Sequence, residues 1–207
     1  MARKINLNIT DFRDFRNGNY LYVDKTPFIE HLENDGNTVF LFCRPRRMGK
    51  TMNLTMLRYF YDMKEDAKGM FEGLHIENDL IFQKINKYPV IYLSFRDFGK
   101  DNYLATFVKI VNSELRRYLS IEQFSEDVKL TLSDPKTFGT GFLKDVTKNL
   151  FDVYNEKAII LIDEYDKPMM DNVGKPEFED LRNFIKRVMS SALKDNPYLF
   201  RTKVCLE

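Results

Sequence analysis

The chain has 207 residues, of which 43% are hydrophobic, so it is long enough to bury the core of one ordinary domain. Its 18 Phe and 11 Tyr residues exclude an intrinsically disordered chain, and its 32 basic residues against 31 acidic ones do not indicate a globally basic nucleic-acid-binding protein. Two cysteines, Cys43 and Cys205, cannot build a disulfide framework, and no apolar segment has the length of a signal-peptide core or of a membrane helix. We therefore expect a soluble cytoplasmic protein with no membrane partner.

The first 36 residues form a lead-in rich in Tyr, Phe and Asp, and their pattern specifies no particular structure. Residues 37–207 form the main predicted domain. Three of its runs are short and almost continuously hydrophobic, which is typical of strands covered by helices on both faces. The predicted strands are Thr38–Cys43, Val90–Phe95 and Ala158–Ile162.

Helical periodicity marks four segments between and after the predicted strands. The predicted helices run from near Gly49 to Tyr61, from Leu104 to Leu119, from Phe142 to Tyr154 and from Phe178 to Ala192, with Asp101 as the N-cap of the second. The polar stretches Glu65–Tyr88 and Ser120–Thr137 indicate loops with short helices. This alternation of strands and helices predicts an α/β fold with a parallel sheet and right-handed crossovers.

Residues 44–51 read Arg-Pro-Arg-Arg-Met-Gly-Lys-Thr, and they lie between a predicted strand and a predicted helix, as a phosphate-binding loop does. Backbone N–H groups at a helix N-terminus attract phosphate, and Gly49 lets the main chain approach it closely. Lys50 would reach the β- and γ-phosphates, and the Thr51 hydroxyl would bind Mg²⁺. The predicted nucleotide-binding residues are Arg46, Arg47, Met48, Gly49, Lys50, Thr51 and Met52.

This loop departs from the usual phosphate-binding pattern, because Arg44 stands where a glycine is found five residues before Gly49. The alternative interpretation is a basic helix N-terminus without a ligand. Cations at that position oppose the helix macrodipole, however, and four of the seven residues from 44 to 50 are cationic. An anion bound in front of them is the more economical explanation.

The predicted strand Ala158–Ile162 ends in two adjacent carboxylates, Asp163 and Glu164. In a P-loop enzyme the first acid holds Mg²⁺, and the second orients and polarises the attacking water. Taken alone, such a pair is also typical of a turn or a helix cap. Together with the preceding loop, it predicts that Thr51 and Asp163 hold the metal. The predicted catalytic residues are Glu164 and Lys50.

Several segments, spread in order over most of the chain, resemble the predicted AAA-ATPase-like family. They are residues 22–26 (Tyr-Val-Asp-Lys-Thr), 42–51 with the loop above, 71–74 (Phe-Glu-Gly-Leu), 88–90 (Tyr-Pro-Val) and 162–168 (Ile-Asp-Glu-Tyr-Asp-Lys-Pro). The Arg-Pro-Arg-Arg variant of the loop is itself typical of this family, so the departure from the general pattern supports the resemblance.

The resemblance implies the P-loop NTPase fold, a three-layer α/β/α sandwich, with ATP and Mg²⁺ as cofactors. It implies that Lys50 and Thr51 bind phosphate and metal. It assigns the metal and hydrolytic roles to Asp163 and Glu164. It also implies that Tyr22–Thr26 lies near the nucleotide, and that full-length members often carry a nuclease-like domain.

The same resemblance implies a further strand that follows the last predicted helix and lies between the strands at 38–43 and 158–162. Residues 195–207 follow that helix, and their apolar stretches 198–200 and 204–206 look too short and broken to form it. We therefore expect the sheet to lack its C-terminal strands and the chain to be part of a longer protein. The alternative is a minimal variant in which the two strands pair directly.

The sequence thus favours an ATP-binding module that hydrolyses ATP with Mg²⁺. The alternative is a nucleotide-dependent switch with little or no turnover that acts on an effector domain, or within a homo-oligomer. A weaker alternative is nucleic-acid contact through the basic loop at 44–47. His31 and His75 have no Cys/His cluster near them in the sequence. The spacing of Glu72, His75 and Glu77 predicts a solvated turn rather than a metal site.

Overall fold

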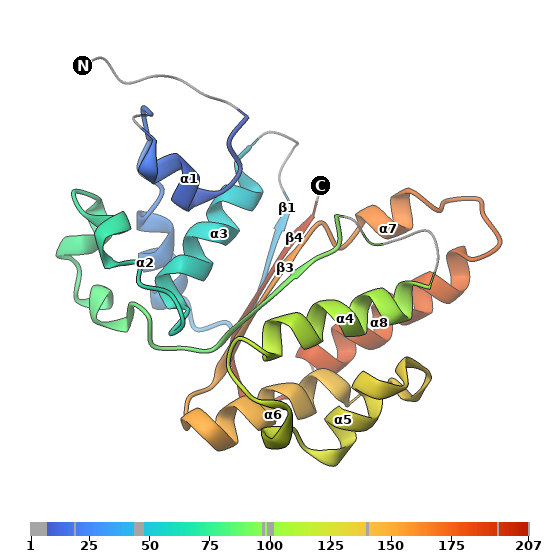
Figure 1. Cartoon of the computed structure of the whole chain (residues 1–207). Helices are drawn as coiled ribbons and strands as arrows, with labels where there is room; N and C mark the ends of the chain where they lie inside the picture. The colour runs from blue at the N-terminus through green and yellow to red at the C-terminus, as the bar shows by residue number, and fades with distance from the viewer. Residues whose placement is uncertain are drawn as a thin grey trace.

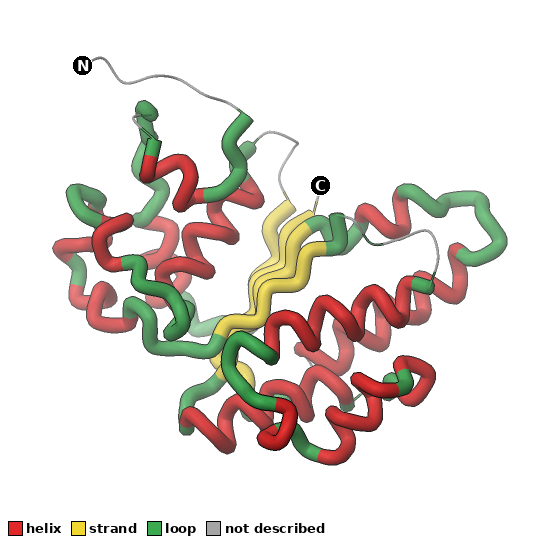
Figure 2. The backbone as a smooth tube through the Cα atoms, in the orientation of Figure 1, coloured by secondary structure: helices red, strands yellow, loops and turns green. Residues whose placement is uncertain are grey.

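A central parallel sheet separates two layers of helices in the computed structural model, which describes residues 8–18, 20–43, 48–96, 98, 102–139, 141–193 and 195–206 (Figures 1 and 2). The described strands are β1 (Val39–Cys43), β2 (Val90–Ser94), β3 (Ala158–Asp163) and β4 (Leu199–Leu206). They run in the order β1-β4-β3-β2, and each neighbouring pair is parallel. This confirms the predicted α/β fold with a parallel sheet and helices on both sides.

Each face of the sheet buries a core of its own (Figure 1). One face packs against α1 (Phe12–Asn17), α2 (Pro27–Asn34) and α3 (Lys50–Tyr61). The other packs against α4 (Tyr103–Leu115), α5 (Glu126–Ser133), α6 (Phe142–Tyr154) and α8 (Phe178–Leu193), and the short α7 (Lys167–Met170) follows β3. All six residues of β3 are buried, and alternate residues contribute to the two cores, as expected of a central strand.

The predicted elements agree with the observed ones to within a few residues. The predicted N-cap Asp101 lies outside the described residues, and α4 is capped by Asn102, whose side chain accepts a hydrogen bond from the Ala105 N–H. The two polar stretches contain α5 and short 3₁₀ turns, namely η1 (Lys68–Phe71), η2 (His75–Asn78), η3 (Leu80–Lys84), η4 (Ile121–Gln123) and η5 (Pro135–Thr137). In the described part of the chain, none of the helices has both the length and the apolar character that crossing a bilayer requires.

The lead-in contains two helices that the sequence pattern did not specify. Asp11 is the N-cap of α1, where its carboxylate accepts hydrogen bonds from the N–H groups of Arg13 and Asp14. Phe12 of α1 and Ile29 of α2 are fully buried in the same core as α3. The lead-in helices therefore help to hold α3 against the sheet.

Strand β4 shows that one expectation is wrong, namely that the C-terminal residues are too short and broken to form a strand. β4 has eight residues and lies between β1 and β3, where the family resemblance implies a further strand. β1 and β3 therefore do not pair directly. The hydrophobic pattern did not indicate this strand because Arg201, Thr202 and Lys203 interrupt it.

The surroundings of Arg201 explain how an inner strand can contain a charged residue. The residue is only 9% exposed. Its guanidinium donates hydrogen bonds to backbone carbonyls at and after the end of α2, namely those of Leu32, Glu33, Asp35 and Asn37. The last carbonyls of a helix lack partners within it and attract cations. Arg201 thus ties the lead-in helix α2 to the centre of the sheet.

Side chains from α4 and the turn after it cover the open edge of β2. The Tyr118 hydroxyl accepts a hydrogen bond from the Val90 N–H at 2.8 Å, and the Glu114 carboxylate accepts one from the Tyr92 N–H at 3.4 Å. An edge strand with unpaired N–H groups is a template for pairing with another chain. These two side chains occupy N–H groups of β2 and so disfavour its pairing with another chain.

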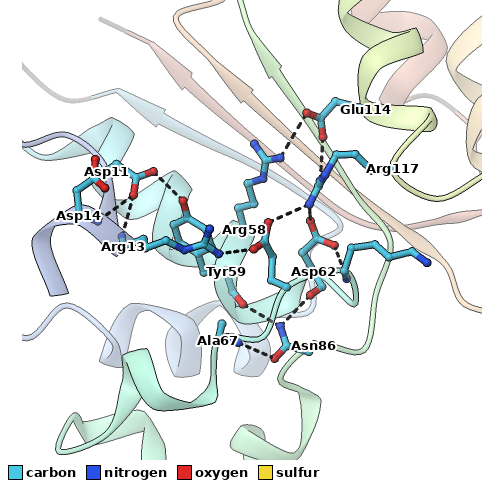
Figure 3. A network of polar contacts seen from close by, with 12 residues as sticks. Asp11, Arg13, Asp14, Arg58, Tyr59, Asp62, Ala67, Asn86, Glu114 and Arg117 are labelled. Atoms are coloured by element: carbon cyan, nitrogen blue, oxygen red, sulfur yellow. Dashed lines mark hydrogen bonds and ion pairs between the residues drawn. The ribbon is translucent and has the colours of Figure 1, made fainter. Parts of the chain in front are cut away.

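A buried polar network joins the end of α3 to α4, as Figure 3 shows. The side chain of Asp62 is fully buried, with an oxygen 2.7 Å from a terminal nitrogen of Arg117. The Tyr118 hydroxyl donates to the same carboxylate at 2.6 Å. Arg117 also pairs with Glu65 at 2.9 Å and with Glu114 at 3.2 Å. The network therefore satisfies a buried carboxylate by a charge and a hydroxyl together.

We expect the substitution Asp62→Ala to lower the free energy of unfolding by about 3–5 kcal/mol, because it removes one partner of a buried ion pair. Urea unfolding followed by circular dichroism measures this loss. The matched control is Asp66→Ala, which removes an exposed carboxylate four residues further on and should change stability by less than about 0.5 kcal/mol. Equal losses in the two variants would show that the network contributes little to stability.

Candidate nucleotide site

The predicted site residues follow the carboxyl ends of β1 and β3. Because the strands are parallel, these ends lie at the same edge of the sheet (Figure 1). Cys43 at the end of β1 pairs in register with Leu206 of β4, and Ile162 of β3 pairs with Val204. One strand, β4, therefore lies between β1 and β3, at whose end the acidic pair lies. In open α/β sheets, ligands bind at the carboxyl ends of the strands.

The N-terminus of α3 has the features of an anion site. Gly49 precedes the helix with a φ of +72°, a left-handed conformation that any residue with a Cβ adopts at a cost. Among the described residues no side chain caps the helix, and its first turn contains no acidic residue. The first N–H groups of a helix have no partner within it, so an anion is a suitable acceptor for them.

The other residues of the predicted loop are placed as follows. Arg46 and Arg47 lie outside the described residues, and Met48 is 58% exposed just before the helix. Lys50 and Thr51 lie half-buried in the first turn of α3. Met52 is also half-buried and packs against the core beneath α3. The lysine and the threonine are therefore held on the helix, while Met52 has a packing role as well.

Asp163 is the last residue of β3 and is only 1% exposed. Ile159 and Leu161 pack in the core that contains α3, so Asp163, two residues further on, belongs to the same face of the strand. Its carboxylate accepts a hydrogen bond from the Tyr92 hydroxyl at 3.1 Å. A buried carboxylate on the side of α3 matches the oxygen ligands that Mg²⁺ prefers.

Glu164 follows in a strained backbone conformation. Its φ is +53°, which is uncommon for a residue that carries a Cβ. The Lys167 N–H donates to the Glu164 carbonyl at 3.1 Å and closes the turn into α7. The Glu164 side chain is 15% exposed, with a carboxylate oxygen 3.5 Å from Nε of Arg96, which follows β2. The strand and its turn thus direct two adjacent acids to different partners.

Sequence reasoning missed Tyr92 and Arg96, which contact the two predicted acids. Both contacts join residues about 70 positions apart, and no local pattern records them. A signal for Tyr92 was present, because its hydroxyl lies in an otherwise mostly aliphatic buried strand and buried hydroxyl groups have partners. No comparable signal distinguishes Arg96 from other arginines after a strand.

The segment Tyr22–Thr26, which the resemblance places near the nucleotide, contacts the middle of α3. The Tyr22 hydroxyl lies 3.6 Å from the sulfur of Met56. The Asp24 carboxylate accepts hydrogen bonds from the N–H groups of His75 and Thr26. Burial raises the pKa of Asp24, but these hydrogen bonds outweigh burial and leave the pKa below its ordinary value. The segment therefore fixes α3 and η2 relative to each other.

His75 lies close to two carboxylates other than the pair, Glu72 and Glu77, that was considered with it in the sequence. Glu77 accepts a hydrogen bond from the Gly73 N–H at 2.8 Å, as in a turn. The ligand atoms of Glu30, His75 and Asp79 lie within 4.8 Å of one another, and they are the one such trio among the residues described. Nε2 of His75 is 3.0 Å from a carboxylate oxygen of Glu30, which accounts for their proximity as an ion pair or hydrogen bond.

Comparisons with known proteins find a relative of this chain and a family whose profile it matches. The chain is 27% identical over 197 residues to an uncharacterized protein in the vnfD 5′ region of Azotobacter chroococcum mcd 1. The match covers 94% of this chain and 35% of that relative, so the chain spans about a third of the relative's length. No solved structure matches the chain.

The sequence profile of the family described as "Predicted AAA-ATPase" matches residues 6–205. This match includes the loop before α3, the acids at the end of β3 and nearly all of β4. The family description supports a nucleotide-binding, ATPase-like module. The chain belongs to the predicted AAA-ATPase family.

Proposed function

We propose that the chain binds ATP with Mg²⁺ at the carboxyl edge of the sheet and hydrolyses it. The observation that carries the proposal is the pairing of two features on one edge. The N-terminus of α3, with no acidic residue in its first turn, begins at a left-handed glycine, Gly49, and a buried carboxylate, Asp163, lies on the strand face that packs against that helix. Phosphates and a divalent cation are the ligands that these two features suit.

In this proposal the first N–H groups of α3 and the ammonium group of Lys50 bind the β- and γ-phosphates. Thr51 and Asp163 hold Mg²⁺, which neutralises charge on the phosphates when bound. Glu164 orients a water molecule and accepts its proton. Arg46 and Arg47 add positive charge to the loop, and Met48 and Met52 flank it.

A second candidate function is a switch that binds ATP with negligible turnover, and one observation favours it. The carboxylate of Glu164 is paired with Arg96 rather than directed at the solvent. A carboxylate held by a guanidinium has to leave that partner before it can engage a water molecule. Because Arg96 is 45% exposed, however, the pair contributes little free energy and can open without a large cost.

A single-turnover assay separates the two functions. The protein is held in excess over radiolabelled ATP, and ADP formation is followed with Mg²⁺ and with a chelator. Hydrolysis predicts Mg²⁺-dependent conversion to ADP in one exponential phase. A switch predicts stable binding with no conversion above the rate of the Glu164→Gln variant. Failure of ATP to bind at millimolar concentration contradicts both functions.

We further propose that the module acts in the cytoplasm on an effector domain or within a homo-oligomer. The support is that the relative from Azotobacter chroococcum is about three times as long as this chain. Nucleic-acid contact through residues 44–47 is a weaker proposal, because a phosphate-binding loop would use the same cationic side chains. Salt-dependent DNA binding that ATP abolishes would support it, and DNA binding that ATP leaves unchanged would place the contact elsewhere.

A further inference from the structure

We propose that Tyr92 is a positioning residue that orients the carboxylate of Asp163 for its cation. The inference rests on the proposed function, since it assigns the cation to Asp163. It adds a residue from a different strand, which neither the phosphate-loop pattern nor the acidic pair includes.

The two residues lie on neighbouring strands and on the same face. Ser94 of β2 pairs in register with Asp163, so Tyr92 lies two residues earlier on the adjacent strand. Tyr92 packs against the core that contains α3, on the strand face to which Asp163 belongs. Its hydroxyl reaches along the sheet and donates to Oδ2 of Asp163 at 3.1 Å. With Asp163 only 1% exposed, this hydroxyl does for the carboxylate what water would do on a surface.

Tyr92 is itself held by residues of two helices. The guanidinium of Arg58, on α3, lies 5.3 Å from the ring centroid, which is cation–π distance. Arg58 also pairs with Glu114 of α4 at 3.4 Å (Figure 3). A carboxylate oxygen of Glu114 accepts the Tyr92 backbone N–H. Tyr92 is therefore held at three points, namely its ring, its backbone N–H and its hydroxyl.

The hydroxyl is the donor in this contact, because a carboxylate can only accept a hydrogen bond. Burial raises the pKa of Glu114, although Arg58 and Arg117 act in the opposite direction. A protonated phenol beside a buried carboxylate fixes which oxygen of that carboxylate is engaged. Hydrogen bonds of this kind orient metal-binding carboxylates, and their loss costs about 10- to 100-fold in metal affinity.

The test is the dependence of nucleotide binding on Mg²⁺ in the variant Tyr92→Phe. Binding of a fluorescent ATP analogue is titrated against Mg²⁺ concentration and again in chelator. We expect the half-saturating Mg²⁺ concentration to rise about 10-fold or more, because one oxygen of Asp163 loses its donor. Affinity in chelator should stay within about twofold of wild type, since phosphate contacts on α3 are unchanged. A loss of folding alone would weaken both titrations together.

Tyr88→Phe is the matched control. It removes a tyrosine hydroxyl four residues earlier, from a ring that stacks on Phe200 at 4.5 Å and has no role in the proposed site. Its Mg²⁺ dependence should equal that of wild type. In an Asp163→Asn background, Tyr92→Phe should have no further effect, because the residue acts through that carboxylate.

The titrations distinguish failure of the proposed function from failure of the positioning role of Tyr92. If wild type binds no ATP analogue, or binds it without any dependence on Mg²⁺, the proposed function fails. If wild type depends on Mg²⁺ and Tyr92→Phe has the same midpoint, the positioning role fails. Should Tyr92→Phe not fold, Arg58→Lys keeps the hydroxyl but replaces the planar cation over its ring. We then expect a smaller shift of the midpoint in the same direction, and an unchanged midpoint overturns the role.

Discussion

The variant Lys50→Ala is expected to bind ATP about 100-fold more weakly than wild type. Lys50 lies in the first turn of α3, beside the N–H groups that we assign to the phosphates. Hydrogen bonds from an ammonium group to phosphate are charge-assisted, and removing one leaves the phosphate charge uncompensated. Equilibrium titration with a fluorescent ATP analogue measures the change.

The matched control for this variant is Lys68→Ala, which removes an exposed lysine from η1. The net charge of both variants is the same, so a general electrostatic effect on nucleotide binding would weaken both equally. We expect the control to bind ATP as wild type does. If Lys50→Ala and wild type have equal affinity, the phosphates do not bind at the start of α3.

The variant Glu164→Gln is expected to retain ATP binding and to lose hydrolysis by about 10²- to 10⁴-fold, because the amide cannot accept a proton from water. Glutamine has the shape of glutamate, and both residues carry a Cβ at the positive φ of this position. The substitution therefore leaves the backbone strain unchanged. Single-turnover conversion of radiolabelled ATP measures the rate, and the same titration as above measures binding.

Glu177→Gln serves as the control for Glu164→Gln, because it neutralises an exposed carboxylate in the segment after α7. Its rate should equal that of wild type. Unchanged hydrolysis in Glu164→Gln would remove the proposed base from the mechanism. Loss of both binding and hydrolysis would assign Glu164 to the nucleotide site as a structural residue instead.

The sheet was largely predictable because its strands are buried on both faces. Continuous hydrophobic runs indicated β1, β2 and β3 to within one residue at each end. β4 was missed because Arg201, Thr202 and Lys203 divide its apolar residues into two short stretches, and Arg201 brings a charge into an inner strand. That charge is satisfied by carbonyls of α2, about 165 residues away in the chain, and hydrophobic periodicity contains no information about such a partner.

The proposed site residues come from local patterns in the sequence, and their roles stay predictions. The glycine, lysine and threonine at the start of α3 and the two acids at the end of β3 follow from strand-to-helix spacing. The contacts that hold the acids could not be predicted in this way. Tyr92 and Arg96 reach Asp163 and Glu164 across the sheet, and only the strand order brings them together. The register of β2 on β3 is a tertiary property, set by packing rather than by either segment alone.

The most direct test of a nucleotide site at this edge is a crystal structure of the chain with a non-hydrolysable ATP analogue and Mn²⁺. We predict that the β- and γ-phosphates contact the first turn of α3. The anomalous signal of the metal should lie between the Thr51 hydroxyl and the Asp163 carboxylate. A nucleotide bound away from α3, or a metal with neither residue as a ligand, would contradict the account.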